Sequence, residues 1–142
     1  MPDTATPREV FHRLVDGVTR LVAGDRTQVD RLADLYAGDT HVSHPFLGDP
    51  PLRGREEVRR HFAAVPATGR PGFRVEDVHV HETTDPEVVV AEFAYAGDGF
   101  RYRCVFVIRV RDGLIVESRD YIDHLRSARA TGRLDDLLSR IG

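Results

Sequence analysis

The chain has 142 residues, of which 41% are hydrophobic and 30% charged, and this balance is typical of a globular protein with one hydrophobic core. The formal net charge is −3, and basic and acidic residues are interleaved, which argues against a nucleic-acid-binding surface. The sequence contains no Lys, which excludes a Schiff-base lysine and a P-loop of the usual kind.

No apolar run approaches the roughly 18 residues that a membrane span requires. The first ten residues, MPDTATPREV, lack the basic and apolar parts of a signal peptide, so we expect a cytoplasmic protein. Cys104 lies in the apolar run CVFVIRV, where a buried and inert thiol is the expected state. We expect one domain over residues 1–142, with its core between about residues 7 and 125 and a helical tail over residues 125–142.

A helix is predicted to begin near the N-terminus. Thr6 supplies a capping hydroxyl, Pro7 suits the first helical position, and Glu9 follows the cap by three residues. Apolar residues then recur three and four positions apart until Gly24, which is a natural helix stop. The pattern therefore predicts one amphipathic helix between Pro7 and Gly24.

The next segments predict a second helix, a short strand and a third helix. The second helix is expected at about Thr27–Ala37, joined to the first by a short turn. Asp39–Phe46 is a brief β-branched segment that is followed by a loop over Leu47–Arg53. Arg55–Val65 has helical periodicity and is stopped by Pro66.

Beyond residue 72 the apolar pattern changes from helical to extended. Four runs are rich in Val, Ile, Phe and Tyr, namely Phe73–Glu82, Glu87–Ala96, Phe100–Arg111 and Leu114–His124. They are separated by short turn sequences with Pro or Gly, which predicts three consecutive hairpins and an antiparallel meander. The tail, Leu125–Ile141, has helical spacing and is expected to pack on the rim of the sheet or on a partner.

Helices that come first and strands that follow are typical of an α+β domain in which helices cover one face of the sheet. We predict a cone-shaped, curved mixed or antiparallel sheet wrapped around three helices, with a conical cavity between them. This order, with GDTHVSHPFLGDPPLRGREEVRRHF and RVRDGLIVESRDYID, resembles the ketosteroid-isomerase-like, SnoaL-like branch of the nuclear transport factor 2-like superfamily. The resemblance covers about residues 7–125 and implies a cystatin-like α+β barrel.

The register of the last hairpin decides which side chains face the core. A three-residue loop over residues 111–113 pairs Val110 with Leu114 and, further along, Cys104 with Asp120. One face is then apolar except at Ser118 and Asp120, whereas the opposite face mixes arginines with Glu117. The mixed face suits solvent or a subunit interface. A two-residue loop would shift the pairing by one residue and mix charges into both faces, so we favour the longer loop.

Asp120 is the anomaly on the apolar face. A buried carboxylate is costly, so this side chain needs a raised pKa, a hydrogen-bond partner or contact with a water-filled cavity. Each of these conditions makes Asp120 a candidate catalytic acid or base. The alternative is that Asp120 caps or braces a neighbouring backbone segment.

His44 is the second candidate, because it precedes Pro45 where the short strand opens into a loop at the expected mouth of the cone. Imidazole titrates near neutrality and can move a proton in either direction. The resemblance places His44 where steroid isomerases hold a general-base aspartate, and Asp120 where limonene-epoxide-hydrolase-like members hold an acid or base carboxylate. The two side chains can form a dyad or act on opposite sides of a ligand. The alternative is a loop histidine with only a structural role.

Other positions depart from both family patterns. Gly17 and Phe106 stand where the isomerases hold their oxyanion-hole tyrosine and aspartic acid, and Phe93 and Tyr95 stand where the epoxide hydrolases hold an arginine and an aspartate. We therefore predict a mostly apolar substrate pocket with phenol donors. Its predicted lining is Val42, Phe62, Phe93, Tyr95, Tyr102, Phe106 and Ser118.

Asp77, His79 and His81 form a D-x-H-x-H pattern that suits metal ligation, but the intervening valines compete for the core, and we predict no metal site. The expected function is an isomerase, cyclase or hydrolase that acts without a cofactor on an apolar polyketide-, steroid- or terpenoid-like molecule. General acid–base catalysis by His44 and Asp120 would carry it, in a homodimer formed through the outer face of the sheet. A non-catalytic module that binds a small ligand or a partner, or a structural subunit with a filled pocket, remains open.

Overall fold

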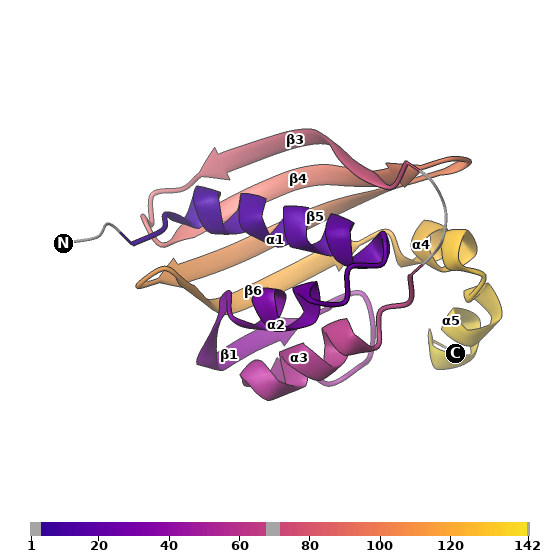
Figure 1. The fold of residues 1–142 in the computed structure, drawn as a ribbon, viewed down its shortest axis with the longest axis horizontal. Helices are drawn as coiled ribbons and strands as arrows, with labels where there is room; N and C mark the ends of the chain where they lie inside the picture. Colours follow the sequence, from indigo (N-terminus) through magenta and orange to yellow (C-terminus); the bar gives the residue numbers. More distant parts are fainter. Residues whose placement is uncertain (1–3, 68–71, 142) are drawn as a thin grey trace.

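Residues 4–67 and 72–141 are described by the structure, a computed structural model, and they form five helices and one six-stranded sheet (Figure 1). The helices are α1 (Pro7–Val22), α2 (Gln28–Ala33), α3 (Arg55–Ala63), α4 (His124–Thr131) and α5 (Leu134–Ile141). The strands are β1 (Tyr36–Ser43), β2 (Leu52–Arg53), β3 (Arg74–Glu82), β4 (Val88–Gly97), β5 (Phe100–Arg111) and β6 (Leu114–Ile122). They lie in the order β2-β1-β6-β5-β4-β3, and only β1 and β6 are parallel neighbours. The predicted α+β class with a mixed sheet is confirmed.

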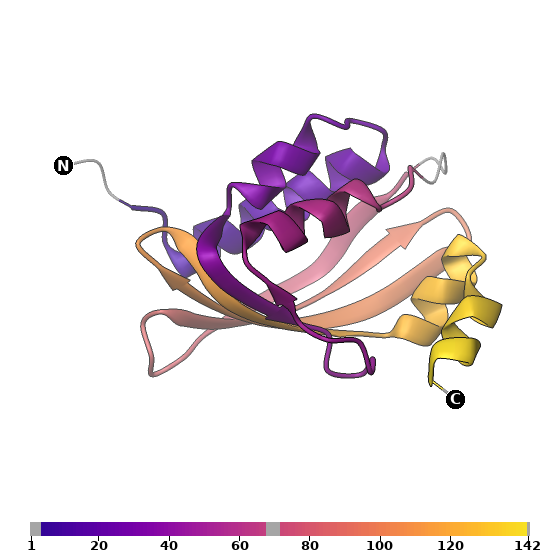
Figure 2. The same ribbon diagram turned by 90° about the horizontal axis from the view of Figure 1, so that it is seen from below.

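The helices α1, α2 and α3 lie on one face of the curved sheet, and α4 and α5 lie beyond one end of it (Figure 2). The hydrophobic core fills the space between this helical layer and the strands. Phe11 of α1, for example, is fully buried and makes an edge contact with Phe93 of β4 at a ring-centroid distance of 5.3 Å. The arrangement explains why the strands carry apolar side chains on one face, and it confirms the predicted curved sheet covered by three helices.

The start of α1 follows the predicted capping pattern, because the Glu9 backbone N–H donates to the Thr6 hydroxyl at 3.2 Å. The second helix is shorter than the predicted Thr27–Ala37. Tyr36 already pairs with Ile115, and the Ile115 N–H donates to the Leu35 carbonyl at 2.8 Å. The parallel ladder with β6 therefore ends the helix early, and β1 begins and ends three residues before the predicted strand.

Two further segments differ from prediction. Leu52 and Arg53, expected in a loop, form the edge strand β2 against β1. The tail, expected as one short helix, forms two, because Gly132 adopts the left-handed conformation with φ of 72° after α4. Among the helices of residues 4–67 and 72–141, none has both the length and the apolar character that crossing a membrane would need.

The predicted register of the β5–β6 hairpin is wrong along its whole length, because Val110 pairs with Ile115 and not Leu114, and Cys104 pairs with Ile122 and not Asp120. Asp112 and Gly113 both have positive φ, 53° and 78°, and form a two-residue loop that pairs Arg111 with Leu114. Val116 is then an extra residue in β6, so that Arg109 pairs with Glu117 and Phe106 with Asp120. The bulge returns the strand to the predicted alternation, and Asp120 stays on the buried face.

Candidate functional site

An apolar cavity of about 240 Å³ lies between the helical layer and the inner face of the sheet. We call it the inner chamber. Its walls come from α1, β1, α3, β4, β5, β6 and α4, and most of them are aliphatic or aromatic. The polar side chains on these walls are Tyr36, His44, His61, Tyr95, Tyr102, Asp120 and Ser127. A small number of polar groups on an apolar wall is typical of a small-molecule site.

Asp120 reaches the inner chamber from β6, on the face that the bulge at Val116 restores. Its side chain is only 11% exposed, and the Ser118 hydroxyl donates a hydrogen bond to Oδ1. Burial raises the pKa of Asp120 to about 7, because the charged form loses its hydration, and the bond from Ser118 only partly opposes this shift. The predicted burial of a carboxylate on this face therefore has a direct electrostatic consequence.

His44 follows the last residue of β1 and faces the same chamber. Its Nε2 atom lies 3.9 Å from Oδ2 of Asp120, and its side chain is 17% exposed. Burial, together with the neighbouring rings of His61 and His124, lowers the pKa of His44 to about 4. These two rings lie 5.4 and 6.4 Å from the His44 ring, so a proton on any one of the three disfavours protonation of the others.

The two groups therefore form a pair that is uncharged over a wide range of pH. Between about pH 4 and 7, His44 is a neutral imidazole and Asp120 a carboxylic acid. A separation of 3.9 Å is too long for a direct hydrogen bond, and a water molecule or a substrate atom can mediate between them. One member can give a proton while the other accepts one, as acid–base chemistry requires.

The structure separates the seven residues predicted to contact substrate into two groups. Val42, Phe62, Tyr95, Tyr102 and Phe106 line the inner chamber. Phe93 lies behind this wall in edge contact with Phe106, at a ring-centroid distance of 4.9 Å, and Ser118 lies behind Asp120 as its hydrogen-bond donor. Their expected roles in substrate binding remain predictions.

Three residues of the site were not predicted from the sequence. Tyr36 was assigned to the apolar face of the second helix, whereas it begins β1 and reaches the chamber. His61 of α3, which flanks the helix's solvent-exposed side, also lines the chamber, three positions after the buried Val58. His124, predicted as the last residue of the final strand, is the first residue of α4.

A wider cleft of about 420 Å³ adjoins the inner chamber, and both spaces share His44, His61 and Ile122 among their walls. We call this space the outer cleft; the loop that follows β1, the end of α3, α4 and α5 form it. An ion pair between Arg140 and Asp49 links α5 to the opposite loop across the cleft. The outer cleft is therefore a more polar space that leads into the apolar inner chamber.

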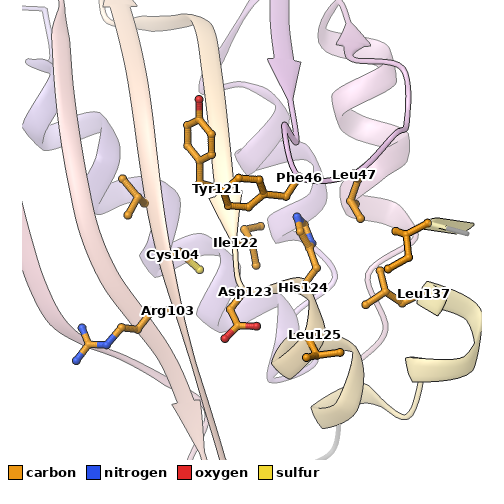
Figure 3. A pocket seen from close by; sticks show the side chains of 12 residues that line it. Phe46, Leu47, Arg103, Cys104, Tyr121, Ile122, Asp123, His124, Leu125 and Leu137 are labelled. Carbon is orange, nitrogen blue, oxygen red and sulfur yellow. The ribbon is translucent and has the colours of Figure 1, made fainter.

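A separate hollow of about 520 Å³ opens beside the ends of β5 and β6 (Figure 3). Its walls include Phe46, Tyr121, Leu125 and Leu137, which come from the loop after β1, from β6, from α4 and from α5. Phe46 is 68% exposed and makes an edge contact with Tyr121. Neither His44 nor Asp120 lines this hollow. This hollow thus lacks the acid–base pair, which lies on the wall of the inner chamber.

The D-x-H-x-H pattern of β3 belongs to the outer surface of the sheet. Asp77 forms ion pairs with Arg101 and Arg103, and His81 Nε2 lies 2.6 Å from Oε2 of Glu92. Within residues 4–67 and 72–141, no group of three or more His, Cys, Asp or Glu side chains is arranged to hold a metal ion. Asp77 also has a positive φ of 54°, where β3 departs from regular pairing with β4. Cys104 is buried, as predicted, and burial raises the pKa of its thiol.

Residues 12–118 match the family model of the SnoaL-like domain, so the chain belongs to the SnoaL-like family. A PhzA/B-like protein of Pseudomonas aeruginosa, itself uncharacterised, is 31% identical over 113 residues, which are 72% of this chain and 77% of that protein. A Catenulispora acidiphila protein with a ketosteroid isomerase-like fold, crystallised with trimethylamine, has a TM-score of 0.67 and 20% identity over 90% of this chain and 95% of its own. A Pseudomonas putida protein provisionally named a polyketide cyclase has a TM-score of 0.63 and 15% identity over 92% of this chain and 99% of its own. The family predicted by resemblance is confirmed.

Proposed function

We propose that the protein is an enzyme that moves a proton on an apolar cyclic carbonyl compound, as an isomerase or cyclase does, by general acid–base catalysis without a cofactor. The observation that carries this proposal is the placement of Asp120 and His44 together on the wall of an apolar chamber. Both side chains are mostly buried, so their protonation states are set by the protein and by the ligand and not by bulk water. The provisional name of the Pseudomonas putida relative is compatible with this reaction class.

Asp120 is the better candidate for the group that moves the proton. A catalytic acid or base works best when its pKa lies near the working pH, and Asp120 has a pKa of about 7. Its carboxylate form takes a proton from a carbon next to the carbonyl group, and the electron pair of the broken C–H bond moves to the carbonyl oxygen. The carboxylic acid then returns the proton to the same or a neighbouring carbon. His44 is neutral above about pH 4 and accepts or donates a hydrogen bond next to Asp120. The sequence favoured His44 as the leading base, whereas here Asp120 moves the proton and His44 supports it.

The size of the chamber limits the substrate. At the packing density of protein interiors, a cavity of 240 Å³ leaves about 180 Å³ for a ligand, which is roughly two fused rings. A longer polyketide-, steroid- or terpenoid-like molecule would extend past His44 and His61 into the outer cleft. The homodimer and the cytoplasmic location predicted from the sequence remain predictions.

The proposal is tested by hydrogen–deuterium exchange on simple ketones. A panel of monocyclic and bicyclic ketones that includes 1-indanone is incubated with the protein in D₂O at pH 7.5, and NMR follows the loss of the protons next to the carbonyl group. We expect faster exchange with the wild type than in buffer, and a loss of about 100-fold or more with Asp120→Asn, because Asn cannot accept the proton. The proposed activity would be contradicted if exchange were no faster than in buffer for every ketone of the panel, or if Asp120→Asn exchanged as fast as the wild type. Binding without exchange would favour the ligand-binding module.

A further inference from the structure

The carboxyl group of Asp120 has two oxygens with different surroundings. The Ser118 hydroxyl donates a hydrogen bond to Oδ1. Oδ2 lies 3.9 Å from Nε2 of His44 and accepts no hydrogen bond in the part of the chain that the structure describes. Among the described residues, His124 Nε2 is the only fully buried side-chain N or O atom without a partner, so Oδ2 is not sealed off from the inner chamber. One oxygen is therefore occupied, and the other is available to a ligand.

Ser118 is placed to act on Asp120 and not on a ligand. It lies on β6 between Val42 of β1 and Ile108 of β5, and it is 1% exposed. Asp120 is two residues further along the same face of the strand and lines the inner chamber, whereas Ser118 does not. A hydroxyl among apolar neighbours is costly unless it is hydrogen-bonded, and the partner of this hydroxyl is Oδ1 of Asp120.

This hydrogen bond limits what the carboxyl group can do. The last torsion of an Asp side chain is soft, so an isolated carboxyl group can turn and present either oxygen. A bond at Oδ1 restrains that rotation and makes Oδ1 the less basic oxygen. We propose that Ser118 is a positioning residue, which holds Asp120 by Oδ1 and so makes Oδ2 the atom that exchanges a proton with the substrate. The assignment rests on the proposed function and adds to it a residue that does not touch the substrate.

The proton transfer then has a defined place. Oδ2 takes the proton from the carbon next to the carbonyl group, the electron pair of the C–H bond moves to the carbonyl oxygen, and the same Oδ2 returns the proton to carbon. Because Oδ2 is the oxygen near His44, the reacting carbon must lie in the part of the inner chamber that His44 also lines, next to the outer cleft. Without Ser118, a share of the molecules would present the proton away from that carbon.

A purely electrostatic role for Ser118 makes a different prediction. A hydrogen bond to the charged form lowers a pKa, and this is the direction in which Ser118 acts on Asp120. The two roles separate at a pH where Asp120 is ionised both in the wild type and in Ser118→Ala. A carboxylate that has only become more basic removes a proton from carbon at least as fast as before. A carboxylate that has lost its position is slower.

The experiment compares Ser118→Ala with the wild type and with a matched control, Thr40→Val. Thr40 also carries a hydroxyl on a residue that is 1% exposed, and it donates to the Ile115 carbonyl at 2.8 Å and does not line the inner chamber. Carbon-13 NMR of the full chain with labelled aspartate follows the titration of Asp120, whose signal is assigned by its loss in Asp120→Asn. Exchange of 1-indanone in D₂O is measured from pH 6 to about pH 9.5.

We expect Ser118→Ala to raise the pKa of Asp120 by about one pH unit, because the charged form loses a hydrogen bond. Above about pH 9, where Asp120 is ionised in both proteins, exchange should still be about tenfold slower than in the wild type. Thr40→Val should change neither the titration nor the exchange rate, although it also removes a buried hydrogen bond. Ser118→Thr, which keeps the hydroxyl, should restore both.

Three results would overturn the assignment. The titration of Asp120 could be the same in Ser118→Ala as in the wild type, which would mean that the hydrogen bond does not form. Exchange at high pH could be as fast in Ser118→Ala as in the wild type, which would leave only the electrostatic role. Thr40→Val could slow exchange as much as Ser118→Ala, or Ser118→Thr could match Ser118→Ala in both measurements, which would make the loss an effect of packing.

This assignment and the proposed function fail in different ways. Exchange that requires Asp120 but not Ser118 would keep the enzyme and remove the positioning residue. No exchange by the wild type would remove the enzyme and the proton-transfer role of Oδ2 together, even where the titration shows that the hydrogen bond exists.

Discussion

The two faces of strands β4, β5 and β6 hold ionisable groups under opposite conditions. On the inner face, Asp120 has no cationic partner within hydrogen-bond distance, and burial raises its pKa to about 7. On the outer face, Glu87 accepts hydrogen bonds from Arg109 and Arg111, which lower its pKa to about 2. Asp85 joins the same ion-pair cluster through Arg109 at 2.8 Å.

This difference follows from the alternation of side chains along a strand. Arg109 points outward to acids that share its solvated surface, whereas Ile108, its neighbour on β5, pairs with Ser118 on the buried face. Exposed ion pairs are numerous but each contributes little, because water and salt screen them. A single buried carboxyl group is therefore expected to influence stability more than any one of these exposed ion pairs. Three variants test this contrast between the two faces.

The largest effect is expected from Asp120→Asn. The folded protein holds a proton on Asp120 up to about pH 7, whereas the unfolded chain loses it near 3.8, so this group lowers the free energy of unfolding as the pH rises between these values. About three pKa units correspond to roughly 4 kcal/mol. Asn has no such dependence. Relative to the wild type, the variant should therefore gain up to about this amount between pH 4 and 8, measured by urea unfolding.

The next effect has the opposite sign and comes from His44→Gln. The unfolded chain protonates this histidine below about 6.5 and the folded protein only below about 4, so His44 raises the free energy of unfolding as the pH rises through that window. The size is roughly 3 kcal/mol. Gln removes this dependence, so the variant should lose stability relative to the wild type between pH 4 and 7. Urea unfolding of both single variants and the double variant, as a function of pH, checks that Asp120 and His44 contribute with opposite signs.

In the wild type these two contributions nearly cancel between pH 4 and 6.5. Other groups with lowered pKa values, among them His61 and His124, are retained in all variants, so the differences between variants report the pair together with its coupling to these two rings. If the free energy of unfolding changed with pH in the same way in the wild type and in both single variants, the two side chains would not be buried as the structure places them.

The inner position of Asp120 was predictable from the sequence although the predicted turn was wrong. The three-residue loop was preferred in order to keep one apolar face, and the molecule achieves this with a two-residue loop and the bulge at Val116. Beyond the bulge, the predicted and the observed pairings of β5 with β6 differ by two residues in register. Because side chains alternate between the two faces, a shift of two residues leaves the same residues pointing inward. Near the turn they differ, and Ile115 is buried where Leu114 and Val116 were expected.

Other features of the site require the three-dimensional structure. The early end of α2 results from pairing between β1 and β6, which lie 70 or more residues apart and have no local signal. Because Tyr36 was assigned to the helix, its contact with the chamber was not predicted. The pKa values of His44 and Asp120 depend on how much water reaches each group, which residue spacing does not determine.

The smallest effect is expected from Glu87→Gln on the outer face. The ion pairs lower the pKa of Glu87, so its contribution is present above about pH 4.5 and is lost as the pH falls toward 2. The variant should unfold at a slightly lower temperature than the wild type at pH 7. The difference should shrink at lower pH and in about 1 M NaCl, where the Debye length is about 3 Å. Comparison with Arg111→Gln and the double variant isolates the pair. A salt-independent loss as large as the change in Asp120→Asn would mean that the outer cluster is buried, for instance in a subunit interface, and the contrast between the two faces would disappear.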